Sequence, residues 1–229
     1  EAYIAPYGYK SKTRPEDKTR RHLILLAKNE EGYKNLILLT TKAHLEGYYY
    51  KPRIDRDLLK RHVAGLIGLS GCLNGELAYA ILHGKKEEAI QIAQEYQDIF
   101  GKGNFYLELQ HHPKLKDQEK VNEALGEISR LVKIPFVATA DIHYLSLEDQ
   151  RAQEVLVAIN TNKELSDETR LSMKACDLSF ASQKTMEKRF GDFPEAIENT
   201  LRIKELCNLE IELGSLKLPE FPIEKGEES

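Results

Sequence analysis

Short apolar segments alternate along the chain with longer segments whose apolar residues recur three and four positions apart. A short apolar run bounded by turn residues is typical of a buried strand, and the longer spacing marks one face of a helix. The predicted strands are His22–Ala27, Gly65–Ser70, Asn104–Leu109 and Phe136–Thr139. The predicted helices are Glu31–His44, Asn74–Leu82, Lys85–Phe100 and Gln118–Val132. Repeated strand–helix units favour an α/β fold, a mainly parallel sheet or barrel with helices outside.

The pattern changes after Tyr144, where helical spacing dominates. The predicted elements there are helices Leu147–Thr161, Gln183–Phe190 and Pro194–Cys207, a short strand Leu178–Ala181 and an extended stretch Leu209–Phe221. We expect a helical extension packed on the sheet, followed by a linker. The chain opens at Glu1 on residues 2–6, which are typical of a strand already under way, and stops in a polar stretch. We therefore expect an internal piece of a longer protein.

The composition suits one large domain with a real core. The chain has 229 residues, of which 41% are hydrophobic and 31% charged, and a formal net charge of −4. This charge argues against a domain that wraps nucleic acid, although it leaves local contact with DNA open. The cysteines at 72, 176 and 207 form no disulfide framework, which favours a reducing, cytoplasmic compartment. No apolar run approaches the ~18 residues of a membrane span.

Asp141 and His143 carry the first sign of chemistry. They follow the apolar run 134–140, and two residues of a strand that are two positions apart point to the same face. In α/β barrels, active sites lie at the carboxyl ends of the strands. Asp and His are also common metal ligands, so the pair predicts a metal site.

Three more metal-capable residues lie at the ends of predicted strands. Glu1 precedes the first apolar segment, His22 opens the next strand, and Cys72 follows the turn after Ser70. Together with Asp141 and His143 they mix hard and borderline ligands, which suits Zn, Mn or Fe better than Ca or Mg alone.

Each of these residues also has an ordinary structural interpretation. Glu1 can be a solvated chain end, His22 a strand-edge histidine and Cys72 a small buried apolar residue. Asp141 can cap the segment that follows it. The pair His111–His112 lies before Pro113 in a polar loop and is predicted to face solvent.

Longer sequence motifs around these positions, called words below, resemble motifs of the alpha subunits of bacterial DNA polymerase III, the replicative polymerase. The resemblance covers essentially the whole chain, and its words fall in the same order. They are His22–Tyr33, Glu46–Asp55, Leu69–Glu76, Phe105–Gln110, Val137–Tyr144, Pro194–Thr200 and Leu218–Ile223.

The resemblance implies the N-terminal polymerase and histidinol phosphatase (PHP) domain, a distorted (βα)7 TIM-like barrel with a trinuclear metal cluster at its mouth. Of the family's nine ligand positions, five match here: Glu1, His22, Cys72, Asp141 and His143. The other four would lie upstream of Glu1, so we expect an incomplete barrel lacking about two strands. We predict a partial PHP barrel over residues 1–145, a helical extension over 146–215 and a linker toward the polymerase palm over 216–229.

The resemblance further implies DNA-directed DNA synthesis by the parent protein and a metal-dependent 3′–5′ exonuclease, or proofreading, activity in the intact domain. The catalytic aspartates of the palm are absent, so the fragment alone is expected to be inactive. Two alternatives stay open: a non-catalytic scaffold that docks a proofreading subunit, and a stand-alone phosphatase, which the polymerase-type words disfavour. Expected partners are DNA, the sliding clamp and a proofreading subunit, with no membrane. Candidate phosphate contacts are Arg20, Arg21, Lys51 and Arg53, although a solvated basic surface is an equal interpretation.

Overall fold

A six-stranded sheet organises the protein, in a computed structural model that describes residues 1–216 and 218. The strands lie in the order β3-β1-β2-β4-β5-β6, so β3 and β6 are its two edges and the sheet is not closed. This open, mixed α/β arrangement confirms the predicted fold class of an incomplete, barrel-like domain. The strand bounds are β1 Ala2–Ile4, β2 Arg21–Ala27, β3 Arg53–Ile54, β4 Leu66–Leu69, β5 Phe105–Gln110 and β6 Phe136–Thr139.

Strand β2 runs against both of its neighbours, a feature that the sequence pattern did not reveal. Tyr3 of β1 pairs with His22, and Ile24 pairs with Leu69 of β4, both in antiparallel register. The pairs β1–β3, β4–β5 and β5–β6 are parallel, and the last two join strands of the predicted, mainly parallel sheet. Because β2 is reversed, its first residues lie beside the last residues of β4, at the same end of the strands.

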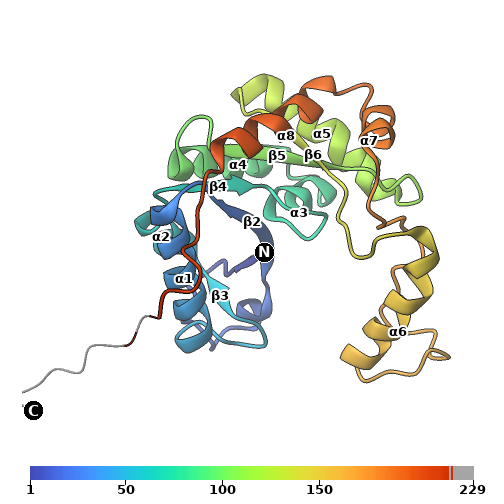
Figure 1. Cartoon of the computed structure of the whole chain (residues 1–229), viewed down its shortest axis with the longest axis horizontal. Coiled ribbons are helices and arrows are strands. Elements are labelled where there is room, and N and C mark those ends of the chain that lie inside the picture. The colour runs from blue at the N-terminus through green and yellow to red at the C-terminus, as the bar shows by residue number, and fades with distance from the viewer. Residues whose placement is uncertain (217, 219–229) are drawn as a thin grey trace, which may run out of the picture.

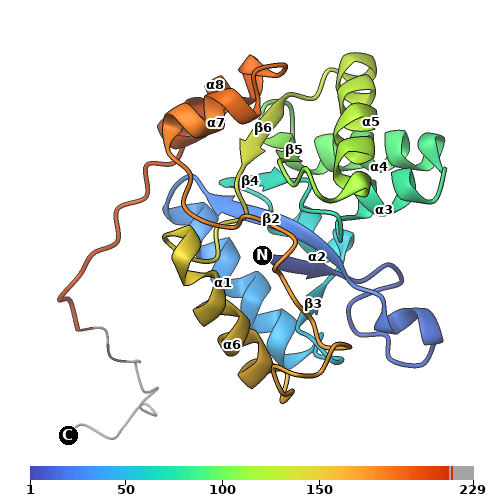
Figure 2. The same cartoon turned by 90° about the vertical axis from the view of Figure 1, so that its right-hand side faces the viewer.

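Helices cover the sheet unequally on its two faces (Figures 1 and 2). The main core lies between one face and helices α1 to α5, and it includes Leu107 and Leu109 of β5. Tyr106, which directly precedes Leu107 on the strand, points to the other face, where it joins a smaller cluster with Ile203 of α8. Each fully buried Leu contributes roughly 1.5–3 kcal/mol to the free energy of folding, so the larger core dominates stability. The helices are α1 Glu30–Leu45, α2 Arg56–Arg61, α3 Glu76–Leu82, α4 Lys86–Phe100, α5 Lys116–Val132, α6 Gln150–Asn160, α7 Gln183–Arg189 and α8 Pro194–Leu206, with short 3-10 helices at Pro15–Lys18 and Leu147–Asp149.

Helix α6 projects away from the rest of the molecule on two connecting segments (Figure 1). The predicted strand at Leu178–Ala181 is instead a single bridge between Ser179 and Tyr144. The Tyr144 hydroxyl accepts a hydrogen bond from the backbone N–H of Leu178 at 3.1 Å, so the returning chain is tied to the segment that leaves β6. One short ladder cannot build a strand, since extended pairing needs several consecutive partners.

Two short elements of the structure were not predicted, and some predicted boundaries are not tested by the structure. Strand β3 and helix α2 were not predicted, because a strand of two residues is too short to show periodicity. The predicted linker 216–229 lies mostly outside the described residues. The boundaries 1–145 and 146–215 remain predictions. Within the described part of the chain, no helix combines the length and the apolar character needed to cross a bilayer.

Candidate metal centre

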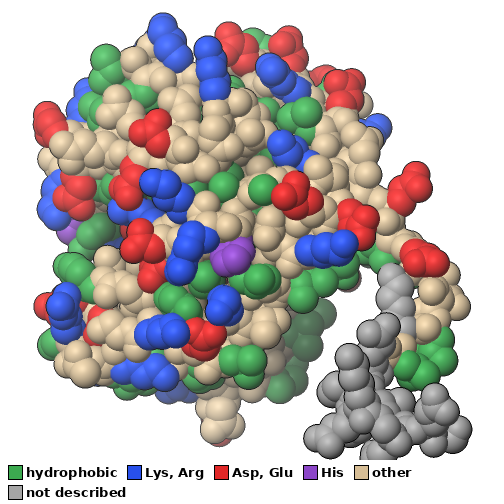
Figure 3. All heavy atoms as spheres, turned by 90° about the vertical axis from the view of Figure 1, so that its left-hand side faces the viewer, with side chains coloured by type: hydrophobic (Ala, Val, Ile, Leu, Met, Phe, Trp, Pro, Cys, Tyr) green, Lys and Arg blue, Asp and Glu red, His purple; other side chains and the backbone are tan. Residues whose placement is uncertain are grey.

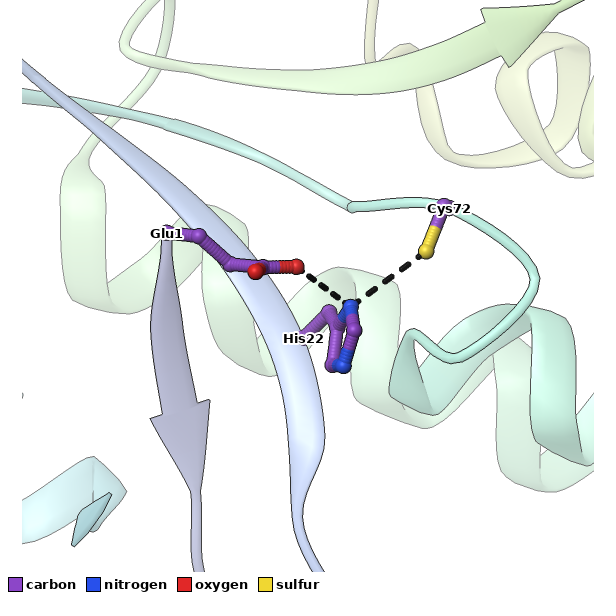
Figure 4. Close-up of side chains that lie close together, drawn as sticks. All are labelled: Glu1, His22 and Cys72. Atoms are coloured by element: carbon purple, nitrogen blue, oxygen red, sulfur yellow. Dashed lines mark hydrogen bonds and ion pairs between the residues drawn. The ribbon is translucent and has the colours of Figure 1, made fainter. Parts of the chain in front are cut away.

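Glu1, His22 and Cys72 come together beside the start of β2, from three separate segments of the chain (Figure 4). The Glu1 carboxylate contacts Nδ1 of His22, and Sγ of Cys72 lies 3.4 Å from the same nitrogen. The three candidate ligand atoms lie within 4.8 Å of one another. A carboxylate oxygen, an imidazole nitrogen and a thiol sulfur at this spacing fit a borderline divalent metal ion.

The backbone around Cys72 is built for close approach to β2. Gly71 has φ +80°, and a Cβ atom there would lie 2.7 Å from the carbonyl oxygen of His22. The backbone N–H of His22 donates to the carbonyl oxygen of Asn74 at 3.1 Å, and His22 forms a bridge with Gly75. Glycine tolerates both the left-handed conformation and the crowding, so the loop after β4 can fold back onto the start of β2.

The electrostatics of this group are mutually reinforcing. Hydrogen bonding to Cys72 and to Glu1 raises the pKa of His22 to about 9, against the opposing effect of burial. The hydrogen bond to His22 in turn holds the pKa of Glu1 below its ordinary value. The Tyr3 ring packs edge-on against His22 with ring centroids 5.2 Å apart, which fixes the imidazole plane.

Asp141 and His143 lie apart from this group. Both residues are exposed, and Asp141 adopts a left-handed backbone with φ +48°. His143 Nδ1 lies 2.7 Å from the backbone oxygen of Asp141 and 3.9 Å from its carboxylate, so the pair is folded on itself. Across the described residues, the ligand atoms that meet within 4.8 Å are those of Glu1, His22 and Cys72. A ligand role for Asp141 and His143 therefore remains a prediction.

Two buried polar side chains near these loops were missed by sequence reasoning. Glu108 of β5 is 5% exposed, and its carboxylate accepts hydrogen bonds from Thr139 Oγ1 at 2.6 Å and Gln110 Nε2 at 3.0 Å. Within residues 1–216, its second oxygen has no hydrogen-bond partner, and burial raises the pKa of Glu108. The alternation of Tyr106, Glu108 and Gln110 along an apolar strand was the available signal, because it places Glu108 on the face away from the main core.

His112 corrects a second prediction, because it is 7% exposed rather than solvent-facing. Burial lowers the pKa of His112, while the negative charge of Asp141 opposes that effect. Its Nδ1 atom has no hydrogen-bond partner among the residues that the structure describes. The polar loop sequence misled the prediction, since local polarity does not show which distant segments lie close enough to act on His112, as that of Asp141 does.

The four candidate phosphate contacts separate into three kinds. Lys51 is exposed, and Arg20 and Arg21 are half-buried. Arg53 is fully buried and donates to the backbone oxygens of Gly47, Tyr9, Ser11 and Asp17, so the prediction that it meets DNA is wrong. A guanidinium committed to four carbonyl groups in the interior has a structural role.

Comparison with known proteins gives consistent results along the chain. Residues 1–112 match the model of the PHP domain family. The chain is 42% identical to the DNA polymerase III subunit alpha of Treponema pallidum over 97% of its length, which is 19% of that relative. It is 44% identical to the corresponding protein of Borreliella burgdorferi over 97% of the chain and 19% of the relative. For Thermus aquaticus the identity is 39%, over 99% of the chain and 19% of the relative. The chain thus spans about a fifth of the length of the curated relatives it matches.

Proposed function

Because residues 1–112 belong to the PHP domain family and nearly the whole chain is related to DNA polymerase III alpha subunits, we propose that it serves as the PHP domain of a replicative polymerase. In that setting the domain hydrolyses phosphodiester bonds at DNA 3′ ends with the help of divalent metal ions. The observation that carries this proposal is the convergence of Glu1, His22 and Cys72. DNA synthesis by the parent protein and a cytoplasmic location are part of the same proposal.

The residues have distinct proposed roles. Glu1, His22 and Cys72 would hold a metal ion, and Asp141 and His143 would complete the ligand set from the loop after β6. A bound divalent ion of the Zn, Mn or Fe type supplies Lewis-acid polarisation of a phosphoryl oxygen and neutralises developing charge. Tyr3 keeps the His22 ring in place, and the half-buried Arg20 can orient phosphates next to it. Arg21, the neighbour of His22 on β2, points to the opposite face, where its guanidinium lies 3.5 Å from the centroid of the Tyr79 ring. No side chain of the described residues is assigned as a separate general base.

The proposal is tested on the parent polymerase by metal analysis and by digestion of a 3′-labelled oligonucleotide. Cys72→Ser and Asp141→Asn are expected to lower both metal content and release of the label, whereas Asp192→Asn, beside helix α8 on another part of the surface, should leave both unchanged. Equal metal content and equal digestion in all four proteins would exclude a hydrolytic metal site built on these residues.

A second candidate is a non-catalytic scaffold that stabilises the polymerase and docks a proofreading subunit or the sliding clamp. It is favoured by the separation of Asp141 and His143 from the other three residues. On this alternative, the same substitutions leave digestion by the polymerase at background and change its stability or its binding of the other subunits. Measuring subunit binding beside digestion separates the two candidates.

A stand-alone phosphatase, acting on small phosphate esters, is the least supported function. The relatives named above are polymerase subunits and align over nearly all of the chain, including its last third. Hydrolysis of histidinol phosphate by the chain, in the absence of any activity on DNA, would favour the phosphatase instead.

A further inference from the structure

The loop that joins β1 to β2 is basic in an otherwise acidic chain. Residues 5–20 contain five Lys and Arg residues against two acidic ones, whereas the whole chain has a net charge of −4. One of the two acids, Asp17, is buried, and its carboxylate accepts hydrogen bonds from Ser11 Oγ, Thr13 N and Arg14 N at 2.7, 2.9 and 2.8 Å. The exposed part of this loop therefore presents a strong excess of positive charge.

Exposed tyrosines stand among these cations. Tyr7 and Tyr50 are 54% and 58% exposed. The Arg14 guanidinium lies 5.3 Å from the centroid of the Tyr7 ring, and Lys18 Nζ lies 5.7 Å from that of Tyr50. A single exposed aromatic ring is common on a protein surface and needs no explanation. Two exposed rings on adjoining segments, each paired with a cation, indicate an interaction surface. We call Tyr7, Arg14, Lys18, Arg20, Tyr50 and Lys51 the tyrosine–cation surface.

The framework beneath this surface is rigid. The buried Arg53 guanidinium donates to the carbonyl groups of Tyr9 and Ser11 in the β1–β2 loop and of Gly47 before Tyr50, at 3.1, 2.7 and 3.1 Å. It thereby clamps the two segments that carry the rings to one another. A surface held in place before binding loses less conformational entropy when a ligand arrives.

The surface continues to the candidate metal centre. Arg20 lies just before β2, and its positive charge acts on Tyr3, where it opposes the rise in the pKa of the phenol that burial causes. Tyr3 pairs directly with His22 across the strands, and their rings are in contact. Arg20 Nη1 donates to the carbonyl oxygen of Lys18, whose side chain reaches Tyr50. A linked series of residues thus runs from Tyr50 through Lys18 and Arg20 to the His22 side of β1 and β2.

A hollow elsewhere on the molecule has balanced charges rather than an excess of positive charge. It has a volume of about 1080 Å³, lies between α5 and α8, and is lined by four Lys or Arg and four Asp or Glu residues. It lies at the start of β5 and β6, away from Cys72 at the end of β4. Figure 3 shows a face on which basic and acidic side chains are likewise interspersed. Such balanced surfaces are poor sites for a polyanion, so they provide control positions.

We propose that the tyrosine–cation surface binds single-stranded DNA, with bases stacked on Tyr7 and Tyr50 and phosphates held by Arg14, Lys18, Arg20 and Lys51. Successive bases stack on aromatic side chains in sequence-tolerant binding of single strands, and a basic groove follows the backbone. With hydrolysis at Glu1, His22 and Cys72 as proposed above, the 3′ end of the strand would lie on the His22 side of the surface. This inference rests on the proposed function at that centre for its direction, but DNA binding by the surface is measured separately from hydrolysis.

The test is fluorescence anisotropy of a labelled oligothymidine of about 16 nucleotides with the full chain, in EDTA so that no hydrolysis occurs. Tyr7→Ala and Tyr50→Gly are each expected to weaken binding about 5- to 150-fold, the effect of losing one stacked base. Glycine is used at position 50 because Tyr50 has φ +62°. Tyr50→Phe should bind the oligonucleotide as tightly as the wild type does, because it keeps the ring. Lys51→Ala should reduce the slope of log affinity against log salt concentration by about 0.7, whereas Lys102→Ala, at the mixed-charge hollow, should not change it.

The outcomes separate this inference from the proposed function. Wild-type affinity in both tyrosine variants, or binding of duplex DNA as tight as that of the single strand, would overturn the stacking surface. If those variants bind normally while the parent polymerase digests 3′ ends in a Cys72-dependent manner, the surface is wrong and the hydrolytic centre stands. Unchanged circular dichroism melting of each variant verifies that the binding change is local.

Discussion

The sulfur of Cys72 lies 3.4 Å from Nδ1 of His22, the nitrogen that also contacts the Glu1 carboxylate. Sequence distance hides this relationship, since fifty residues separate Cys72 from His22. The reversed strand β2 and the glycines at 71 and 75 create it. A thiol sulfur is the softest of the three donor atoms, so its place in this group gives it a measurable role in metal preference.

Replacing Cys72 by Ser is expected to remove most of the stabilisation that Zn²⁺ gives to the chain. A ligand at ~100 times its Kd stabilises a folded protein by about 2.7 kcal/mol, which a thermal melt detects readily. Mn²⁺ prefers oxygen and nitrogen ligands, so its smaller effect should change less. Thermal melts with each metal and in EDTA make the measurement. Cys207→Ser, at the end of α8, is the matched control, and an equal loss of the Zn²⁺ effect in that variant would show that Cys72 has no special part.

Replacing Arg53 by Met is expected to lower the free energy of unfolding by about 3 kcal/mol or more, because several buried carbonyl groups lose their donors. Arg53→Lys should not restore stability, since an ammonium group lacks the planar fork that reaches Gly47, Tyr9 and Ser11 together. Urea unfolding measures both variants. Arg61→Met removes an exposed arginine with one bond to Asp57 and should stay within about 0.5 kcal/mol of the wild type. A similar loss in the two Met variants would contradict the clamp.

Arg53 also shows where prediction from the sequence stops. Strands β2, β4, β5 and β6 and most of the long helices were predictable because periodicity is local. Arg53, in contrast, stands among charged residues and resembles a surface cation until Gly47, Tyr9, Ser11 and Asp17 are placed around it. The direction of β2 and the splitting of the five predicted ligands into two groups have the same origin. Both depend on pairing and loop paths between residues far apart in the chain, which a local pattern does not contain.

The buried pair Glu154–Arg170 is expected to hold the loop after α6 in place. Glu154 is 2% exposed and accepts hydrogen bonds from Arg170 Nη2 at 2.6 Å, Ser172 Oγ at 2.8 Å and Met173 N at 2.7 Å. Arg170→Met leaves a buried carboxylate without its cation, at a cost of roughly 3–5 kcal/mol. Hydrogen exchange should show faster opening of residues 161–175, with protection of α1 to α5 unchanged.

The matched control for that pair is the double variant Glu154→Leu, Arg170→Met. It removes both charges and should recover most of the lost stability, because the penalty arises from one unpaired charge. Burial alone would raise the pKa of Glu154, but the hydrogen bonds from Met173, Arg170 and Ser172 hold it below the ordinary value of 4.5. Its contribution is therefore present above about pH 4.5 and is lost as the pH falls below that value. A double variant as unstable as Arg170→Met would show that the pair is not the cause.

Glu108→Gln is expected to flatten the dependence of stability on pH without destabilising the chain at pH 7. Burial raises the pKa of Glu108 above its ordinary value of 4.5, so the folded state holds the proton more tightly than the unfolded state. The resulting stability is greatest below pH 4.5 and is lost as the pH rises through the raised pKa. Gln keeps an oxygen to accept from Thr139 and Gln110 and carries no charge, so urea unfolding from pH 4 to 8 should show a smaller decline. Glu119→Gln on the exposed side of α5 should preserve the wild-type slope. If the stability of Glu108→Gln instead declines more steeply with pH than that of the wild type, the fold requires the ionised carboxylate. A metal ligand, or a group that binds the loop of Asp141, would behave in that way.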